Sequence, residues 1–269
     1  MFSKKIIYSF LLSLFFLSFS AYSADLNGIL KSGEVKIAVP EAFAPFGSVG
    51  KTGEHEGYDV DVAKLIAKDL GVKLKIVPVV SKQRIPFLET DKVDLVISTM
   101  GANPSRAKSI NFSSAYAPFY SGVFAPSTIK VSSYKDLDGL TIGVTGGTLE
   151  DLELTKMAPK GAKITRFGDN AATLSAIKSK QVQVLVAGNT VAASVTEANP
   201  DFDLERKFII KDSPCFIGVK KGNEDLLRWV NVFILHKKLG GALNKISQKW
   251  LGQDPVSYTH LTLPTIGEV

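Results

Sequence analysis

The sequence predicts an α/β protein with parallel strands, built from two similar units. In residues 35–108, short apolar runs alternate with segments of helical periodicity, and a strand–helix–strand order is typical of parallel sheets. A second alternation of the same kind begins near Leu137, and in both units a turn rich in Gly, Ser or Thr leads from a strand to a helix. A chain of 269 residues is long enough for one large domain or two smaller ones.

The first unit contains a well-marked helix between strands. Asp59 is expected to cap this helix and Gly71 to end it. Its apolar positions are Val62, Leu65, Ile66 and Leu70. The expected elements are a strand at 35–39, a helix at 57–71, a strand at 73–79, a short helix at 81–88 and a strand at 95–97.

The second unit repeats this alternation. Its Gly-rich turn at 145–148 is followed by a helix, and Thr148 with Asp151 resembles a capping box with Asp in place of Glu. Residues 117–126 between the units read as an extended crossing. The expected elements are strands at 140–144, 163–167, 182–187, 208–210 and 216–219, and helices at 171–180, 190–198, 223–238 and 242–250.

The two ends of the sequence differ from the rest. Residues 1–23 have a charged start, an apolar run and small residues before position 24, which predicts a cleaved export signal. The alternative is an uncleaved anchor, although the apolar run is short for a bilayer span. Residues 256–269 lack periodicity and resemble translated vector sequence more than native protein. We therefore expect an exported, periplasmic protein and no functional role for the tail.

Charge and cysteine content exclude several classes. The net charge is +6, but Lys and Asp/Glu are interleaved without a basic run, so nucleic acid is not an expected partner. The single cysteine, Cys215, allows no intramolecular disulfide. Its apolar neighbours indicate a small buried residue, with a reactive thiol as the alternative. No metal-ligand spacing or phosphate loop is present, so neither a metal nor a cofactor is expected.

Residues 94–108 predict an anion site. An apolar strand ends in the polar residues Ser98 and Thr99 and in Gly101, and Asn103 with Pro104 is typical of a helix start. Arg106 would then lie in the first helical turn, where the helix dipole favours anions over cations. Its natural partner is an external anion such as a carboxylate. The alternative is an ordinary surface arginine.

Several motifs in order resemble one family. They are Gly33–Val39, Ala44-Pro-Phe46, Gly57-Tyr-Asp-Val-Asp61, Lys92–Ser98, Arg106, Asp136–Val144, Gly147-Thr148, Gly218–Gly222 and Lys249–Gly252. Together they resemble the family-3 solute-binding proteins of bacterial ABC transporters, which are periplasmic binding proteins for polar amino acids. The resemblance covers about residues 28–252.

The resemblance implies a two-lobe, type II periplasmic-binding-protein fold with two crossing hinge strands. Lobe one would comprise residues 24–118 and 215–255, and lobe two residues 119–214. A small-molecule ligand would bind in the cleft between the lobes and close them, and the closed form of the monomer would dock on an ABC permease in the inner membrane.

The resemblance also implies roles for single residues. Arg106 would hold the α-carboxylate of the ligand, and Thr99 and Gly101 would donate hydrogen bonds to it. Thr148 would contact the ligand, with a plain helix cap as the alternative. Phe43 would cover the ligand side chain, with a core residue as the alternative.

A second arginine and two departures from the family pattern indicate which ligand to expect. The run Ser81–Pro86 resembles that of glutamate and aspartate binders, in which the residue matching Arg84 reaches a second carboxylate, although Arg84 can also be a solvent-facing helix residue. Asn189 stands where many members carry an Asp for the α-ammonium group. In addition, Pro40 replaces a frequent charged side chain, so cationic amino acids are not expected. Asn170 is a further candidate contact from lobe two.

Three functions remain open from the sequence. The first is a transport binding protein for a carboxylate-bearing polar ligand, an amino acid or a dicarboxylic one such as glutamate or aspartate, and not an enzyme. The second is an enzyme on the same scaffold that resembles prephenate or arogenate dehydratases, with Glu150, Asp151 or Glu153 as general acid. The third, the sensory domain of a receptor, is disfavoured because no later membrane or signalling segment follows.

Overall fold

The computed structural model describes residues 25–252. The predicted signal at 1–23 and the tail at 256–269 lie outside the described residues. Between residues 25 and 252, no helix has the length and apolar character needed to cross a membrane. The described chain forms two five-stranded sheets and one small two-stranded sheet, β2 (Ser48–Val49) with β3 (His55–Glu56).

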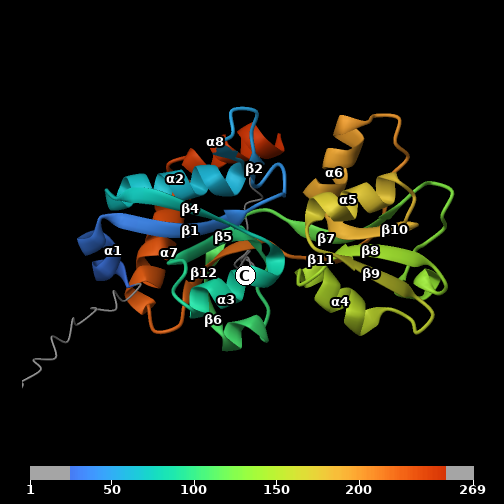
Figure 1. Cartoon of the computed structure of the whole chain (residues 1–269), viewed down its shortest axis with the longest axis horizontal. Coiled ribbons are helices and arrows are strands. Elements are labelled where there is room, and N and C mark those ends of the chain that lie inside the picture. Colours follow the sequence, from blue (N-terminus) through green and yellow to red (C-terminus); the bar gives the residue numbers. More distant parts are fainter. Residues whose placement is uncertain (1–24, 253–269) are drawn as a thin grey trace, which may run out of the picture.

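The first sheet has parallel and antiparallel strands in the order β4-β1-β5-β12-β6. Its strands are β1 (Glu34–Pro40), β4 (Lys73–Val79), β5 (Leu95–Met100), β6 (Ile110–Ala117) and β12 (Cys215–Lys220). Strand β1 is parallel to both β4 and β5, whereas β12 is antiparallel to β5 and β6. The helices beside this sheet are α1 (Leu26–Ser32), α2 (Tyr58–Leu70), α3 (Arg84–Glu89), α7 (Glu224–Leu239) and α8 (Ala242–Leu251). We call this sheet with its helices the first lobe (Figure 1).

The second sheet has the order β11-β7-β10-β8-β9. Its strands are β7 (Tyr120–Ala125), β8 (Thr141–Thr145), β9 (Lys163–Phe167), β10 (Val184–Gly188) and β11 (Glu205–Asp212). Its helices are α4 (Leu149–Met157), α5 (Asn170–Lys178) and α6 (Asn189–Ala198). Figure 1 shows α4 on one side of this sheet and α5 and α6 on the other. We call this sheet with its helices the second lobe.

The chain passes between the lobes twice. It leaves the first sheet after β6 and enters the second at β7, and it returns between β11 and β12. The two crossings touch, because the backbone N–H of Ser213 donates to the carbonyl oxygen of Phe119 at 3.0 Å. The parallel strands β5 and β8 end at the side where the lobes meet, and ligands of open α/β sheets bind beyond the carboxyl ends of such strands.

The predicted α/β class is confirmed, but two predicted helix starts are wrong. Residues 103–108 do not open an α-helix: they form a turn and one 3₁₀ turn, η2 (Arg106–Lys108), because β6 begins at Ile110. The N-cap of this turn is Ser105, and the Asn103 Oδ1 accepts a hydrogen bond from the Arg106 N–H at 2.7 Å. In α2 the N-cap is Gly57, and Asp59 lies inside the first turn with its carboxylate turned inward.

Most other predicted elements are present with ends shifted by a few residues, and β4 and β9 match. The predicted helix at 81–88 is a 3₁₀ turn, η1 (Ser81–Gln83), followed by α3. Elements that were not predicted are α1, β2, β3, β6 and the 3₁₀ turn η3 (Tyr134–Leu137).

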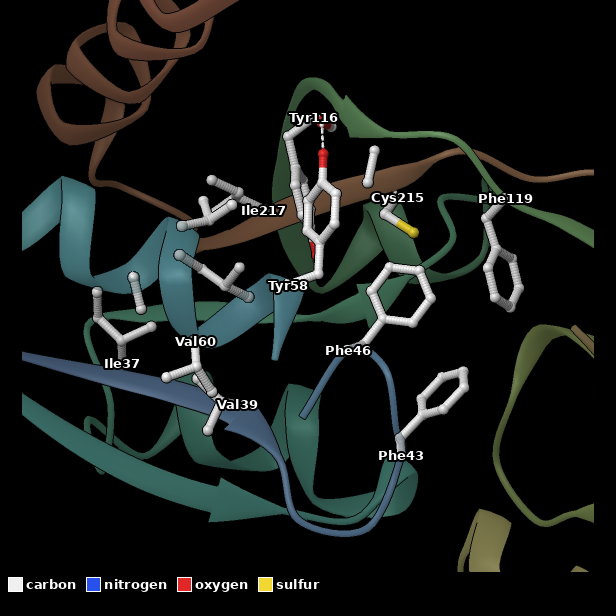
Figure 2. Close-up of a cluster of buried hydrophobic side chains, with 14 of the residues drawn as sticks. Ile37, Val39, Phe43, Phe46, Tyr58, Val60, Tyr116, Phe119, Cys215 and Ile217 are labelled. Carbon is white, nitrogen blue, oxygen red and sulfur yellow. Dashed lines mark hydrogen bonds between the residues drawn. The ribbon is translucent and has the colours of Figure 1, made fainter. Parts of the chain in front are cut away.

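An aromatic cluster fills the first lobe next to the crossings. Figure 2 shows Phe43, Phe46, Tyr58 and Phe119 in this cluster, with Cys215 between the aromatic rings. The Tyr58 hydroxyl donates to the backbone carbonyl of Tyr116 at 3.1 Å. Cys215 is fully buried, which confirms its predicted role as a small core residue.

We expect the thiol of Cys215 to be unreactive in the native protein. Burial raises its pKa well above the ordinary value, and the thiolate is the reactive form. Alkylation of the folded protein by iodoacetamide, followed by mass spectrometry, should be at least ~100-fold slower than alkylation in denaturant. Equal rates in the two conditions would show that the cluster opens freely.

Candidate ligand-binding cleft

A narrow cavity that opens to solvent lies between the two lobes. Its first-lobe and crossing residues are Phe43, Arg84, Thr99, Gly101, Arg106, Phe119 and Ser213. Its second-lobe residues are Thr145, Thr148, Leu149, Glu150, Asn170, Val186, Ala187, Gly188 and Val191. The wall is therefore mixed, with apolar side chains, several hydroxyl groups and three charged groups.

Arg106 connects the two walls of the cavity. Its side chain is only 9% exposed. Its Nη1 donates to the carbonyl oxygen of Gly101 at 2.7 Å, and its Nη2 donates to the carbonyl oxygen of Gly147 in the second lobe at 2.9 Å. Burial lowers the pKa of Arg106, and the charge of Glu150 opposes that shift. A guanidinium held in this way presents a planar set of donors that matches a carboxylate.

Arg84 lines the same cavity as Arg106 and is 5% exposed. It is not a solvent-facing helix residue, because its Nε donates to the Oγ of buried Ser98 at 3.1 Å. Burial and then the charge of Arg106 lower the pKa of Arg84 to about 10, while Asp59 and Glu150 act in the opposite direction. Ser98 thus positions Arg84 and does not itself line the cavity.

Asp59 organises the floor of the cavity. It is fully buried, and its carboxylate accepts hydrogen bonds from the Thr99 Oγ1 at 2.7 Å and the Tyr116 hydroxyl at 2.5 Å. The Thr99 N–H in turn donates to the Tyr116 hydroxyl at 3.3 Å, with Thr99 in the left-handed region at φ 46°. Both donors of Thr99 are therefore engaged with the floor, although Thr99 lines the cavity.

Two glycines allow the lobes to approach closely. A Cβ on Gly101 would lie 2.4 Å from the Ser213 Oγ and 2.9 Å from the Leu149 Cδ2 of the second lobe. A Cβ on Gly147 would lie 2.7 Å from the Cγ of Lys82, and Gly147 also has a φ of +80°. Side chains at these positions would hold the lobes apart.

The second-lobe wall begins at the start of α4. The Thr148 Oγ1 accepts from the Asp151 N–H at 3.2 Å and donates to the Thr145 carbonyl at 2.8 Å, so Thr148 is a helix cap that also lines the cavity. The Oδ2 of Asp151 accepts a hydrogen bond from the Gly147 N–H at 3.0 Å. Asn170 lines the same wall, and its Oδ1 accepts from the Thr145 Oγ1 at 2.9 Å.

Two phenylalanines form the apolar side of the cavity. Phe43 packs on Phe119 with ring centroids 6.3 Å apart, and Figure 2 shows both at the end of the aromatic cluster nearest the second lobe. Phe43 is thus both a core residue and a cavity residue. Gly188 is required beside them, because a Cβ there would lie 1.8 Å from the Phe119 Cζ.

The structure brings most predicted site residues to the cavity but leaves out two besides Ser98. Ser81 lies in a neighbouring recess with Arg84 and Asn170. Asn189 does not line the cavity: its Oδ1 accepts from the backbone N–H of Tyr120 at 3.2 Å. It is therefore occupied in fixing α6 to the crossing strand β7.

Phe119 was not predicted to line the cavity, and Glu150 was predicted there only as a possible general acid of a dehydratase. Glu150 is 7% exposed, and its Oε1 accepts from the Oγ of Ser121 at 2.9 Å. Within residues 25–252, no group of three His, Cys, Asp or Glu side chains is placed to hold a metal ion. The arrangement is therefore two arginines and one carboxylate around a partly apolar cavity between two lobes.

Comparison with known proteins identifies the family of the chain. The model of a family described as bacterial extracellular solute-binding proteins, family 3, matches residues 35–253. The chain therefore belongs to the bacterial extracellular solute-binding proteins of family 3, and the predicted resemblance is confirmed.

Relatives and solved structures support the same placement. The chain is 30% identical to the ABC transporter glutamine-binding protein GlnH of Bacillus subtilis over 208 residues, which are 76% of each chain. It is similar to a crystal structure of an ArgBP mutant from T. maritima, with 30% identity, a TM-score of 0.79 and coverage of 86% of this chain and all of that one. The ancestral amino acid-binding protein AncCDT-1, a precursor of cyclohexadienyl dehydratase, has 30% identity and a TM-score of 0.77 over 84% of this chain and 98% of its own. The predicted two-lobe fold is confirmed.

Proposed function

We propose that this protein is the substrate-binding component of an ABC transporter and that it binds a small amino acid between its lobes. The observation that carries the proposal is Arg106, a buried guanidinium that bridges the two walls of the cavity. A ligand carboxylate can replace the two carbonyl acceptors as the partner of that guanidinium, with a stronger, charge-assisted pair of hydrogen bonds. Names of the relatives, which include glutamine-, L-cystine- and arginine-binding proteins, support amino acids as the ligand class.

The remaining elements of the proposal follow from the family and the two-lobe fold. Residues 1–23 direct export to the periplasm and are removed. The lobes divide at 118/119 and 214/215 and rotate about the two crossings, and the closed monomer docks on a permease. Besides Arg106, contacts come from Gly101, Thr99, Thr148, Asn170 and Phe43, which all line the cavity.

A screen of the common L-amino acids and of dicarboxylates by thermal shift, with calorimetry on the hits, tests this function. The protein should first be unfolded and refolded to remove co-purified ligand. We expect at least one amino acid to bind in the micromolar range or tighter and to raise the melting temperature. Failure of every amino acid and dicarboxylate to bind would refute the proposal.

A dehydratase is the second candidate, and one observation favours it: of the three acids considered, only Glu150 lines the cavity. Asp151 pairs with Arg166 at 2.7 Å, and Glu153 pairs with Lys211 at 3.6 Å. Incubation with prephenate, followed by detection of phenylpyruvate, distinguishes this enzyme from a binding protein. We expect no phenylpyruvate above the rate of the uncatalysed reaction.

A further inference from the structure

Glu150 is a buried carboxylate in the cavity without an ion-pair partner. Among the described residues, no lysine or arginine nitrogen lies within 4.0 Å of its oxygens. Its charge nevertheless acts on both Arg84 and Arg106. Its only hydrogen bond within residues 25–252 comes from the Oγ of Ser121. A carboxylate has more acceptor sites than this one bond uses.

The position of Glu150 on α4 does not by itself explain its burial. An acid in the first turn of a helix gains from the helix dipole even when it is exposed. The neighbouring acids of α4 have other partners, because Asp151 accepts from Gly147 and pairs with Arg166, while Glu153 pairs with Lys211. Glu150 alone of these three points into the cavity and carries a charge that costs free energy unless it is paired.

The charged groups around the cavity indicate what pairs with it. Arg84 is buried in the same lobe as the fully buried Asp59, whose charge raises the Arg84 pKa more than the charge of Glu150 does. Arg106 and Glu150 remain, a cation from the first lobe and an anion from the second. A zwitterion satisfies both at once, with its carboxylate on Arg106 and its ammonium group on Glu150.

We propose that Glu150 binds the α-ammonium group of the ligand and so restricts the site to amino acids of zero net charge. This inference rests on the proposed function. In many family members an Asp at the position of Asn189 holds the α-ammonium group. Here the Asn189 side chain accepts a hydrogen bond from the backbone N–H of Tyr120, and Glu150 takes the ammonium-binding role. A ligand with two carboxylates would leave an excess negative charge beside Glu150 and Asp59, and a cationic ligand would leave an excess positive charge.

Calorimetry with matched ligand pairs tests the inference on the full-length mature chain. The pairs are L-glutamine with glutaramate and L-leucine with isocaproate, in which only the α-amino group differs, and any other hit of the screen is treated in the same way. L-Glutamate tests the effect of a second carboxylate. Glu150→Gln keeps an oxygen for the Ser121 hydroxyl and removes only the charge. Glu153→Gln is the matched control, with the same change in the same helix outside the cavity.

We expect wild-type protein to prefer the amino acid of the binding pair over its deamino analogue, and Glu150→Gln to lower the affinity for the amino acid by roughly tenfold to a hundredfold. The affinity of Glu150→Gln for the analogue should change less than about threefold. Glu153→Gln should bind both the amino acid and its analogue with the affinity of wild type. L-Glutamate should bind wild type more weakly than L-glutamine.

Two results would overturn the inference while the proposed function stands. One is equal binding of an amino acid and its deamino analogue by wild type. The other is an equal loss for both ligands in Glu150→Gln, which would show a merely structural role. If no amino acid binds wild type at all, the proposed function itself fails.

Discussion

Replacement of Arg106 by alanine is expected to remove most of the ligand affinity. Arg106 is buried, and it contacts the first lobe through Gly101 and the second through Gly147. Loss of a desolvated, charge-assisted contact of this kind costs roughly 2–5 kcal/mol, which corresponds to a dissociation constant about 30-fold to several thousand-fold higher. Calorimetric titration with the best amino acid of the screen measures this loss.

Two further variants make the Arg106 result interpretable. Arg106→Lys keeps the charge but cannot present two parallel donors, so its affinity should fall between those of wild type and Arg106→Ala. Arg228→Ala removes an exposed arginine of α7 that does not line the cavity, and it should bind as wild type does. Full affinity in Arg106→Ala would show that the carboxylate binds elsewhere.

The elements that periodicity predicted well are those with strong local signals. The strand β4 and the end of α2 at Gly71 follow from alternation and from a left-handed C-cap at φ 69°. The strand β6 was missed because its sequence, INFSSAYA, is rich in small and polar residues and pairs with β12 about one hundred positions away. Such pairing is a property of the folded chain, and local sequence does not encode it.

The cavity residues divide in the same way into those with a local sequence signal and those without one. Arg106 was predicted because it follows the polar end of a strand, and Arg84 and Thr148 were predicted because their motifs resemble those of the family. The structure places all three on the cavity wall. Glu150 looks in sequence like an ordinary acid at a helix start, directly after the Gly-Thr cap. Only the approach of the lobes brings it opposite the arginines. Asn189 had the right position in the motif, but its side chain is bonded to the crossing strand.

Asp59 shows how a helix-start signal can mislead. An Asp near the start of a predicted helix is a good candidate for an N-cap. In the structure, the preceding Gly57 has a φ of 134° and takes the cap position, and a Cβ there would lie 2.3 Å from the carbonyl oxygen of Phe46. The carboxylate of Asp59 is thereby free to point into the protein, where it bonds to Thr99 and Tyr116.

This buried carboxylate should make the stability of the protein depend on pH. Burial raises the pKa of Asp59 from 3.8 to about 6, and the hydrogen bonds from Tyr116 and Thr99 and the charge of Arg84 only partly oppose that shift. The folded state therefore binds the proton more tightly than the unfolded state. This contribution to the free energy of unfolding is fully present below the unfolded pKa, and it is lost as the pH rises through about 6. A shift of this size corresponds to about 3 kcal/mol.

Asp59→Asn separates this effect from the titration of other carboxylates, because the amide resembles the protonated acid in size and charge. Urea unfolding of both proteins between about pH 4 and pH 8 gives the difference in free energy of unfolding at each pH. We expect wild type to lose roughly 2–3 kcal/mol relative to Asp59→Asn as the pH rises from about 4 to the raised pKa of about 6, with half of the loss complete near about pH 5. Asp201→Asn, which changes an exposed carboxylate, should give a constant difference from wild type. A difference between wild type and Asp59→Asn that stays constant with pH would show that Asp59 is ionised throughout, held as an anion by Arg84.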